Sequence, residues 1–410
     1  TAYEIGLGIP AEPLFRSREL SAFSIYGKLI ILALIQIGGL GIMILSYFTI
    51  FILRRSVSIE DKMLISYMLS EKDMTKLAHS LKNIITITFV IEGVGALLLF
   101  LGFVRGFEGG VIGAVFAAVF HSISAFCNAG FSTFSDSLEG IRSNPYLVVI
   151  FSLLIIFGGI SFAVITNLRQ SLINRFRRLV RKIPEKMIRV SMNSKVVLAV
   201  SGMLLLVATL VFYGLEHGGE MAGYRLGNQY LSSFFQAVTL RTAGFNTVPF
   251  SGFRPVTYLA MAAFMFIGGA SGSTAGGIKV NTLAVMFAYL FSSVRDKDSV
   301  TIYRNSISSS TILRAFLILL FGVTVVVIGT IFLALFEQAP LEHILFEAVS
   351  AFGTVGLSAG LTGSLSGPGK LTVIFLMFLG RIGPLTVLAA ASLSGRKIRI
   401  EYPRGEIAIG

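Results

Sequence analysis

The chain has 410 residues, of which 54% are hydrophobic and only 13% charged, and its formal net charge is +13. This composition excludes an ordinary soluble domain and is typical of an integral membrane protein. The long apolar runs also exclude an outer-membrane barrel, whose strands alternate in hydrophobicity over about ten residues. The single cysteine, Cys127, excludes an internal disulfide framework and the usual cysteine-based zinc sites.

Seven stretches are long and apolar enough to cross a bilayer as helices. They cover residues 29–53, 84–104, 146–166, 196–215, 256–278, 315–336 and 371–395. Three shorter apolar pieces, too short or too polar to span, cover 111–126, 228–240 and 341–352. The chain starts at Thr1 in what reads as a loop, without an initiator methionine or a signal-peptide pattern, so we expect its N-terminus to be truncated.

Basic residues gather in four regions, each after a long apolar helix, at 54–82, 169–195, 295–314 and 396–404. In membrane proteins such regions lie on the cytoplasmic side. We therefore expect a multi-pass protein of the cell (inner) membrane, in contact with lipid, with its basic loops and C-terminus in the cytoplasm. The positive charge then reports topology and not nucleic-acid binding, which would need a solvated basic face.

The three short pieces end in similar phrases, "SAFCNAGFS" at 124–132, "VTLRTAGFN" at 238–246 and "SAFGTVGLS" at 350–358. Superposing them aligns Gly130, Gly244 and Gly356, which are separated by 114 and 112 residues. This is an internal repeat. Gly6, in "TAYEIGLG", lies 124 residues before Gly130 and marks the remnant of a first copy.

The repeat predicts an all-α membrane protein of four tandem helix, pore helix, filter and helix units, with pseudo-fourfold symmetry round one central pore. The predicted segments are a truncated repeat 1 at 1–55, a cytoplasmic linker at 56–80, repeat 2 at 81–182, repeat 3 at 193–298, repeat 4 at 308–398 and a cytoplasmic tail at 399–410.

Glycine loops at membrane depth have a specific physical use. Non-helical backbone is tolerated there only where protein buries it or where it lines a water-filled path. Loops arranged round one axis would direct carbonyl oxygens to a common centre, which is how a pore replaces the hydration shell of K⁺. Glycine permits the backbone angles that this needs. A lone glycine would more simply indicate a turn or a close helix contact, but three in register favour a filter.

These phrases, together with "LIQIGGLGIM" at 34–43, resemble the Trk/Ktr/HKT superfamily of potassium transporters, and most of all its Ktr-type membrane subunit. The resemblance implies potassium uptake by a protein that is not an enzyme. It implies ion coordination by Ile5 and Gly6, by Asn128, Ala129 and Gly130, by Thr242, Ala243 and Gly244, and by Thr354, Val355 and Gly356. The first of these filters departs from the family pattern, because Glu4 stands where threonine is usual and Gly8 is an alternative to Gly6.

The run "IGGASGSTAGGIKV" at 267–280 is too rich in glycine for a stable straight helix, so we expect a break there. Tight helix packing is the alternative explanation. In the family this position forms an intramembrane loop that blocks the pore below the filter. The resemblance therefore implies a gate made of Gly268, Gly269, Ser271, Gly272, Gly276, Gly277 and Lys279 together with Arg381.

Two charged residues lie inside predicted spans. Arg381 is costly in a membrane and is a functional-site hypothesis by default, and the resemblance implies that it restricts cation passage and contacts the gating loop. A structural pair between Arg381 and Glu92 is the alternative. For Glu92 itself, structural pairing is the favoured interpretation.

The resemblance also implies a homodimer and a cytosolic RCK/KTN nucleotide-binding regulatory subunit, with K⁺ as the transported ion, Na⁺ as a possible second ion and no organic cofactor in this chain. Whether the protein is a channel or a coupled symporter stays open. One rival is a cation-coupled secondary transporter driven by protons or sodium, although its usual carboxylate relay is reduced to Glu92.

A more remote rival is an intramembrane serine protease, because "GASG" at 269–272 satisfies the GxSG pattern with Ser271 as nucleophile. Such an enzyme needs a histidine within hydrogen-bond reach of the serine. The four histidines, His79, His121, His217 and His343, are not expected near Ser271.

Overall fold

A computed structural model describes residues 23–53, 77–104, 107, 109–181, 189–250, 252–297 and 299–382. For residues 40–53 and 77–82 it describes the backbone alone. Three predicted features lie outside the described residues. They are the first filter with Ile5 and Gly6, most of the linker at 56–80, and the tail at 399–410.

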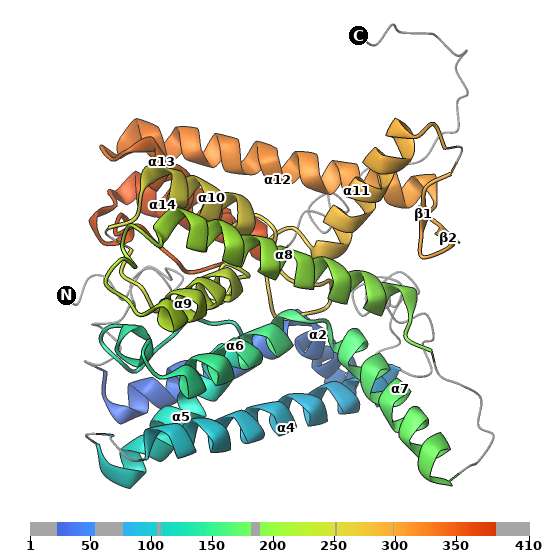
Figure 1. Cartoon of the computed structure of the whole chain (residues 1–410), viewed down its shortest axis with the longest axis horizontal. Helices are drawn as coiled ribbons and strands as arrows, with labels where there is room; N and C mark the ends of the chain where they lie inside the picture. The colour runs from blue at the N-terminus through green and yellow to red at the C-terminus, as the bar shows by residue number, and fades with distance from the viewer. Residues whose placement is uncertain are drawn as a thin grey trace, which may run out of the picture.

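The order of long helix, short helix, loop and helix occurs three times in the described chain (Figure 1). Repeat 2 contains α4 (Leu77–Phe103), α5 (Gly110–Phe126) and α6 (Pro145–Gly159), followed by α7 (Phe162–Arg181). Repeat 3 contains α8 (Met192–Glu216), α9 (Leu226–Thr239) and α10 (Pro255–Met265), followed by α11 (Val280–Val294). Repeat 4 contains α12 (Ser309–Phe336), α13 (Leu341–Gly353) and α14 (Gly367–Ile382), and α2 (Ile25–Leu53) precedes them all.

The remaining elements are small. Two 3₁₀ turns, η3 (Glu139–Ile141) and η4 (Thr362–Ser364), lie between a glycine loop and the next helix. A hairpin of two short strands, β1 (Thr301–Ile302) and β2 (Asn305–Ser306), connects α11 to α12. The all-α prediction is therefore correct except for this antiparallel pair. Its residues connect two helices and do not continue the apolar periodicity of either helix.

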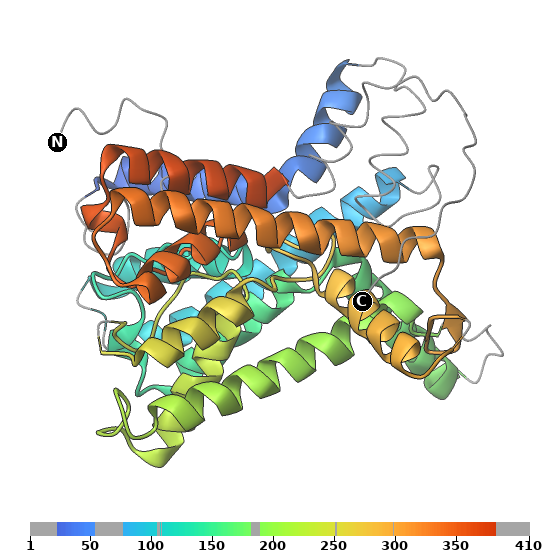
Figure 2. The same cartoon turned by 90° about the horizontal axis from the view of Figure 1, so that it is seen from above.

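Three described helical segments are long and apolar enough to cross a membrane, namely Asn83–Phe103, α8 and α12, and α6 with α7 would be a fourth if they form one bent span. On α12 the side chains of Leu320, Val327 and Leu335 are 50%, 49% and 70% exposed, whereas Val326 and Leu333 on the opposite face are buried. An apolar face exposed to this extent suits a lipid environment. Figure 2 shows α12 and α14 side by side, as their contacts require.

The prediction of one helix over 146–166 is wrong. The α-helix ends at Gly159, and α7 starts at Phe162 after a bend of 103°. The break is stabilised from repeat 3: the amides of Ala270 and Thr274 donate to the carbonyls of Gly159 and Gly158, at 3.0 and 3.2 Å. Apolar composition alone does not record such contacts, since they come from a segment far away in the sequence. Beyond the bend, α7 points away from the pore helices (Figure 1).

The apolar run at 256–278 also contains a break, and this break was predicted. Helix α10 ends at Met265 and the glycine-rich run continues as a loop until α11 begins at Val280. The loop folds on itself through a parallel bridge between Ile267 and Ile278. The prediction of a helix over 371–395 is met by α14 as far as Ile382, after which the residues are not described.

The helix that follows each glycine loop begins at a polar cap. In repeat 2 the side chain of Asn144 accepts the amide of Leu147 at 3.3 Å. In repeat 3 the buried carboxylate of Glu216, at the end of α8, accepts the amide of Arg254 and the hydroxyl of Thr257 at the start of α10. In repeat 4 Glu337 accepts the amide and hydroxyl of Ser366 before α14. A carboxylate at a helix N-terminus satisfies free amides and the helix dipole.

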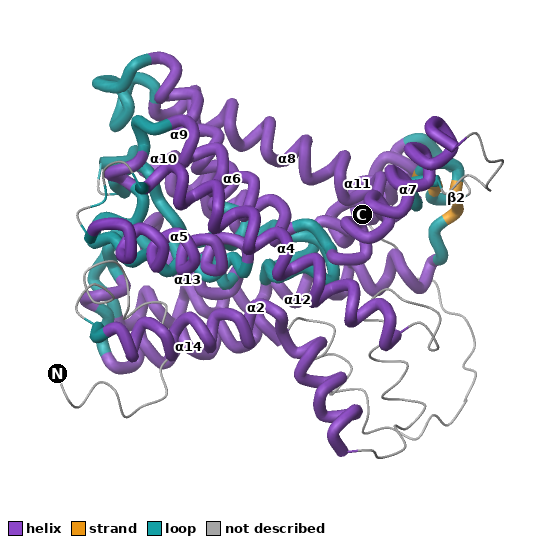
Figure 3. The backbone as a smooth tube through the Cα atoms, turned by 90° about the horizontal axis from the view of Figure 1, so that it is seen from below, coloured by secondary structure: helices purple, strands orange, loops and turns teal. Residues whose placement is uncertain are grey.

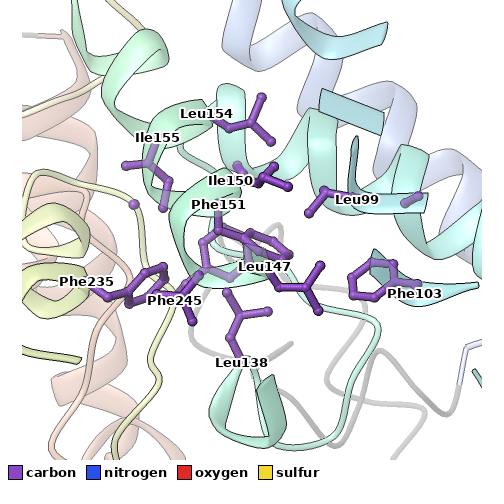
Figure 4. Close-up of a cluster of buried hydrophobic side chains, with 14 of the residues drawn as sticks. Leu99, Phe103, Leu138, Leu147, Ile150, Phe151, Leu154, Ile155, Phe235 and Phe245 are labelled. Atoms are coloured by element: carbon purple, nitrogen blue, oxygen red, sulfur yellow. The ribbon is translucent and has the colours of Figure 1, made fainter. Parts of the chain in front are cut away.

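Repeats 2 and 3 share one apolar core (Figure 4). Leu99, Leu147 and Phe151 of repeat 2 pack in one cluster with Phe235 and Phe245 of repeat 3. A second cluster joins repeats 3 and 4 round Tyr258, Phe346 and Phe352. Within this packing α5 and α9 both contact α6, and α13 contacts α10. Each of these short helices leads into its glycine loop.

Candidate functional site

The three glycine loops share one backbone conformation. Gly130, Gly244 and Gly356 have φ values of +72°, +79° and +81°. Two residues earlier in each loop, Asn128, Thr242 and Thr354 have φ values of +53°, +69° and +51°. Asparagine tolerates this left-handed region, but for a β-branched threonine it is strained. Strained backbone that recurs in this way is typical of functional segments.

The loops also meet in space. A Cβ atom built on Gly130 would lie 2.9 Å from the carbonyl oxygen of Ala243 and from the Cα of Gly244. One built on Gly244 would lie 2.8 Å from the carbonyl oxygen of Val355 and 3.7 Å from the Cα of Gly356. Glycine is therefore required at Gly130 and Gly244 both by φ and by space. The glycines of the predicted coordinating segments in repeats 2, 3 and 4 therefore come together at one place. Figure 3 shows that loops, in teal, run between the helices in the middle of the protein as well as at its ends.

The middle residue of each loop directs its amide away from this meeting point. The amides of Ala129, Ala243 and Val355 donate to carbonyls at the ends of the short helices, at 2.9, 3.0 and 2.8 Å. In the described part of the chain, no protein donor bonds to the nine carbonyl oxygens of the three loops. These belong to Asn128, Ala129, Gly130, Thr242, Ala243, Gly244, Thr354, Val355 and Gly356. Buried carbonyls normally have a partner, so a set without donors is suited to cations.

The loop at 266–279, called here the gate loop, contains every gate residue predicted from its sequence. Gly272 and Gly277 have φ values of +76° and +65°, which only glycine adopts freely. The carbonyl of Gly272 accepts the amide of Phe162 at 3.2 Å, so the loop fills the break between α6 and α7. The amide of Gly268 donates to the carbonyl of Ile278 at 2.9 Å, which brings the two ends of the loop together.

The gate loop reaches the first residue of the predicted filter segment in each of the three described repeats. The Asn128 side chain donates to the hydroxyl of Thr274 at 3.1 Å. A Cβ atom on Gly276 would overlap the Thr354 hydroxyl, and one on Gly268 would lie 3.4 Å from Cγ2 of Thr242. Of these residues Thr274 was not predicted as functional. Its position within the glycine run was the only signal in the sequence.

Arg381 links the gate loop to two helices. From α14 its guanidinium donates to the carbonyl of Thr274 at 3.0 Å and to that of Gly38 in α2 at 2.8 Å. Lys279 donates to the carbonyl of Ala275 at 2.6 Å, across the last turn of the gate loop. The predicted contact of Arg381 with the gating loop is thus present.

The alternative pair between Arg381 and Glu92 is not the arrangement observed for these groups. The carboxylate of Glu92 is buried. It accepts a hydrogen bond from the side-chain amide of Gln36 at 3.1 Å and one from the thiol of Cys127 at 3.7 Å. The Glu92 carboxylate is therefore hydrogen-bonded within the protein, as favoured from the sequence, but its partners are an amide and a thiol and not an arginine. It lies next to the predicted filter segment of repeat 2.

The protease interpretation has no matching geometry among the described residues. The amide of Ser271 donates to the side chain of Asn281 at 3.3 Å. His121 bonds to Ala117 and Ser132, and His217 to the carbonyls of Tyr213 and Gly214. The ring of His343 packs against Tyr258, with centroids 4.6 Å apart, and the side chain of His79 lies outside the description. A serine nucleophile needs an adjacent base, which these histidines do not supply to Ser271.

A polar bridge joins the second and third repeats just outside the filter. Asn246, two residues after Gly244, donates to the carboxylate of Glu139 at 2.7 Å and accepts the amide of Leu138 at 3.0 Å. Burial raises the pKa of the Glu139 carboxyl above its ordinary value. The guanidinium of Arg142 lies 4.7 Å from the ring centroid of Tyr224 in the same region. Sequence reasoning did not single out these residues.

The chain is similar to known proteins over most of its length. The chain is 36% identical to the Ktr system potassium uptake protein B of Vibrio alginolyticus over 390 residues, which cover 95% of this chain and 83% of that protein. It is 35% identical to the protein of the same name from Bacillus subtilis, with 95% and 84% covered. It is 30% identical to the potassium/sodium uptake protein NtpJ of Enterococcus hirae, with 94% and 83% covered.

The fold is similar to the crystal structure of the potassium transporter TrkH from Vibrio parahaemolyticus, with a TM-score of 0.68 at 18% identity, over 92% of this chain and 74% of that one. A family model described as "TrkH: Cation transport protein" matches residues 3–398. Because that match spans almost the whole sequence, the chain belongs to the TrkH family of cation transport proteins.

Proposed function

We propose that this integral membrane protein takes up potassium through a filter made by its glycine loops. The single observation that carries the proposal is the recurrence of one backbone conformation in three loops that meet, with carbonyls that have no donor in the described chain. A ring of such carbonyls replaces the water around K⁺. The relatives named for potassium uptake support this choice of ion.

In this proposal the filter residues are those predicted for repeats 2, 3 and 4, and a fourth loop with Ile5 and Gly6 completes a pseudo-fourfold ring. The repeat and linker boundaries predicted above define the segments. The convergence of three loops from three separate stretches of chain supports a ring with one loop from each repeat. A single chain then supplies the whole pore.

The gate loop controls passage in this proposal. It contacts the first residue of each described filter, and Arg381 attaches it to α14 and α2. Hydrogen bonds to Gly158, Gly159 and Phe162 also hold the loop in place, so its opening has to break contacts with repeat 2 as well as those with Arg381. Its opening is proposed to respond to a cytosolic RCK-type regulatory subunit that binds the basic cytoplasmic face of a homodimer. The Ktr system names of the relatives support a multi-component system.

A cation-coupled transporter is retained as the second candidate, because Glu92 places a carboxyl within 3.7 Å of the Cys127 thiol, one residue before the second filter. The name of the Enterococcus relative, which includes sodium, favours testing Na⁺ as a second ion. No organic cofactor is needed in either mechanism.

The test is ion flux into liposomes that contain the purified protein, with K⁺, Na⁺ and proton gradients varied independently. We expect saturable K⁺ influx that exceeds Na⁺ influx and continues without a proton gradient. Strict dependence on a proton or Na⁺ gradient would establish the coupled transporter instead. The absence of K⁺ flux from folded protein, with or without regulatory subunit, would refute the proposed function.

A further inference from the structure

Three side chains occupy the same place in the three pore helices. Counting back nine residues from each filter glycine gives His121, Phe235 and Glu347. All three are buried in the protein. An imidazole and a carboxylate cost free energy in such a place unless they form hydrogen bonds, whereas a phenyl ring does not. The partners of the two polar residues therefore indicate what they do.

His121 holds the segment that leaves the second filter. Its Nδ1 atom lies 2.7 Å from the carbonyl oxygen of Ala117 and so carries the hydrogen, while Nε2 accepts the amide of Thr133 at 3.3 Å. Nε2 also lies 3.0 Å from the hydroxyl of Ser132, and the ring stacks on Phe134 with centroids 4.5 Å apart. One neutral imidazole thus contacts three consecutive residues that begin two positions after Gly130.

Ser132 extends this anchor into the outer loop. Its hydroxyl donates to the carbonyl of Ser137 at 2.9 Å and accepts the amide of Phe134 at 3.0 Å. The exit from the filter is therefore tied both inward to the pore helix and outward to the turn that follows it.

Glu347 has the same relation to the fourth filter. Its carboxylate accepts the hydroxyl of Thr362 in η4. The amides of Gly360 and Thr362 donate to the hydroxyl of Ser358, at 3.1 and 3.4 Å, and Ser358 lies two residues after Gly356. In repeat 2 the corresponding serine accepts an amide two residues later in the same way. The two repeats hold their filter exits with the same plan and different chemistry.

In repeat 3 the segment after the filter glycine is held by residues of repeat 2 and not by its own short helix. Phe235 offers no hydrogen bond, but Asn246, two residues after Gly244, is held by repeat 2 through Glu139, the amide of Leu138 and the hydroxyl of Ser137, at 2.7, 3.0 and 3.3 Å. The residue two positions after the filter glycine is therefore hydrogen-bonded in every described repeat. Three different solutions for one position indicate that the position itself must be held.

We propose that His121, Glu347 and Glu139 are positioning residues that set ion discrimination by fixing the outer ends of the filter loops; this inference rests on the proposed function. The reason is geometric. Discrimination between K⁺ and Na⁺ depends on where the carbonyls stand and how far they can move, whichever account of selectivity is used. A loop fixed only at its helix end can adapt to the smaller ion, and a second anchor beyond the glycine prevents this.

The test measures the ratio of K⁺ to Na⁺ flux in liposomes for variants at the loop end of each anchor, because those positions are less buried in the core than His121. Ser132→Ala and Thr362→Val each remove one anchoring hydroxyl. We expect each to lower the ratio about fivefold, which corresponds to about 1 kcal/mol. Thr362→Ser keeps the hydroxyl and should restore the wild-type ratio. Ser364→Ala, in the same turn, removes an exposed hydroxyl whose one bond within the described residues is to the carbonyl of Leu361, and should leave the ratio unchanged.

His121→Leu and Phe235→Leu extend the test to the helix end. Both disturb packing at one equivalent position, but only the former removes an anchor, so only it should change the ratio. If His121→Leu does not fold, the hydroxyl variants decide the matter. Folded Ser132→Ala and Thr362→Val with a wild-type ratio would overturn the inference while K⁺ flux itself upheld the proposed function. Wild-type protein without K⁺ flux would refute the proposed function first.

Discussion

The filter loops and the gate loop are both glycine-rich, but they are built in different ways. Each filter loop takes its shape from local backbone conformation, and that shape occurs in repeats 2, 3 and 4. The gate loop occurs in repeat 3. Hydrogen bonds join it to repeat 2 and to Arg381 of repeat 4, and Arg381 also bonds to α2. The difference suggests that selection is a repeated local property, whereas gating depends on contacts between repeats. The two functions should therefore be separable by mutation.

The largest expected effect comes from shortening the gate loop. Deleting Ser271 to Ala275 should raise the maximal K⁺ flux about tenfold, equivalent to about 1.4 kcal/mol, and leave the K⁺/Na⁺ ratio largely intact, apart from a small loss caused by the removal of Thr274. The ends can be rejoined because the two arms of the loop lie close together: a Cβ atom on Gly268 would overlap the carbonyl oxygen of Gly276. Flux should also depend less on the regulatory subunit. The measurement is liposome flux for protein that remains dimeric by size-exclusion chromatography.

Two results would contradict this prediction for the gate loop. Well-folded deletion protein with unchanged or lower flux would show that the loop does not block the path. Protein that loses its fold would show that the loop is a packing contact between repeats, as in the alternative explanation of the glycine run.

A substitution in the filter should do the opposite. Gly244→Ser should lower K⁺ flux and reduce the K⁺/Na⁺ ratio about tenfold, because a side chain meets both a positive φ and neighbouring backbone within 3.0 Å. Gly110→Ser is the matched control: Gly110, at the start of α5, has a φ of +66°, but nothing lies within 4 Å of an added Cβ atom. Equal flux ratios in the two variants would contradict the filter assignment.

Arg381 tests whether gating and ion selection are separate. One of its two described hydrogen bonds is to the gate loop, and neither is to a filter residue. Arg381→Gln should raise K⁺ flux about fivefold at an unchanged ion ratio, since the amide cannot reach two carbonyls at once. Arg381→Lys keeps the charge but loses the planar fork, and should give an intermediate flux. A changed K⁺/Na⁺ ratio in either variant would place the arginine in selection and not in gating.

The smallest expected effect is at Thr274, where the gate loop contacts the filter loop of repeat 2. Its hydroxyl donates to the carbonyl of Gly158 at 2.9 Å and accepts from Asn128 at 3.1 Å. Thr274→Val keeps the shape and removes both bonds, so flux should rise about twofold to fivefold with a small loss of selectivity. Ser273→Ala, which removes a hydroxyl bonded to Ala270 within the loop, is the control. Identical behaviour of the two variants would show that Thr274 does not couple the loops.

Local chemistry explains which parts of this structure could be predicted. The three glycine phrases predicted where the loops are, and the density of glycines after Gly268 predicted the end of α10. Each of these features depends on the conformational freedom of residues within a short window. The role of the loops in ion coordination stays a prediction, and the first filter lies outside the described residues.

Features made by distant contacts could not be predicted in the same way. The bend after Gly159 depends on amides of Ala270 and Thr274, more than a hundred residues later in the chain. The composition of the 146–166 stretch, which is uncharged and mostly apolar, favours one spanning helix. The caps made by Glu216 and Glu337 likewise depend on residues at the far end of each repeat.

The three described filter loops are separate stretches of one chain, and this has an evolutionary consequence. In a pore made from identical subunits, one change in the gene alters every position of the ring at once. Here a change at Gly130 leaves Gly244 and Gly356 untouched. The anchors show the result of such freedom, because an imidazole, a phenyl ring and a carboxylate occupy one equivalent position. A pore built from unequal repeats can therefore diverge one sector at a time.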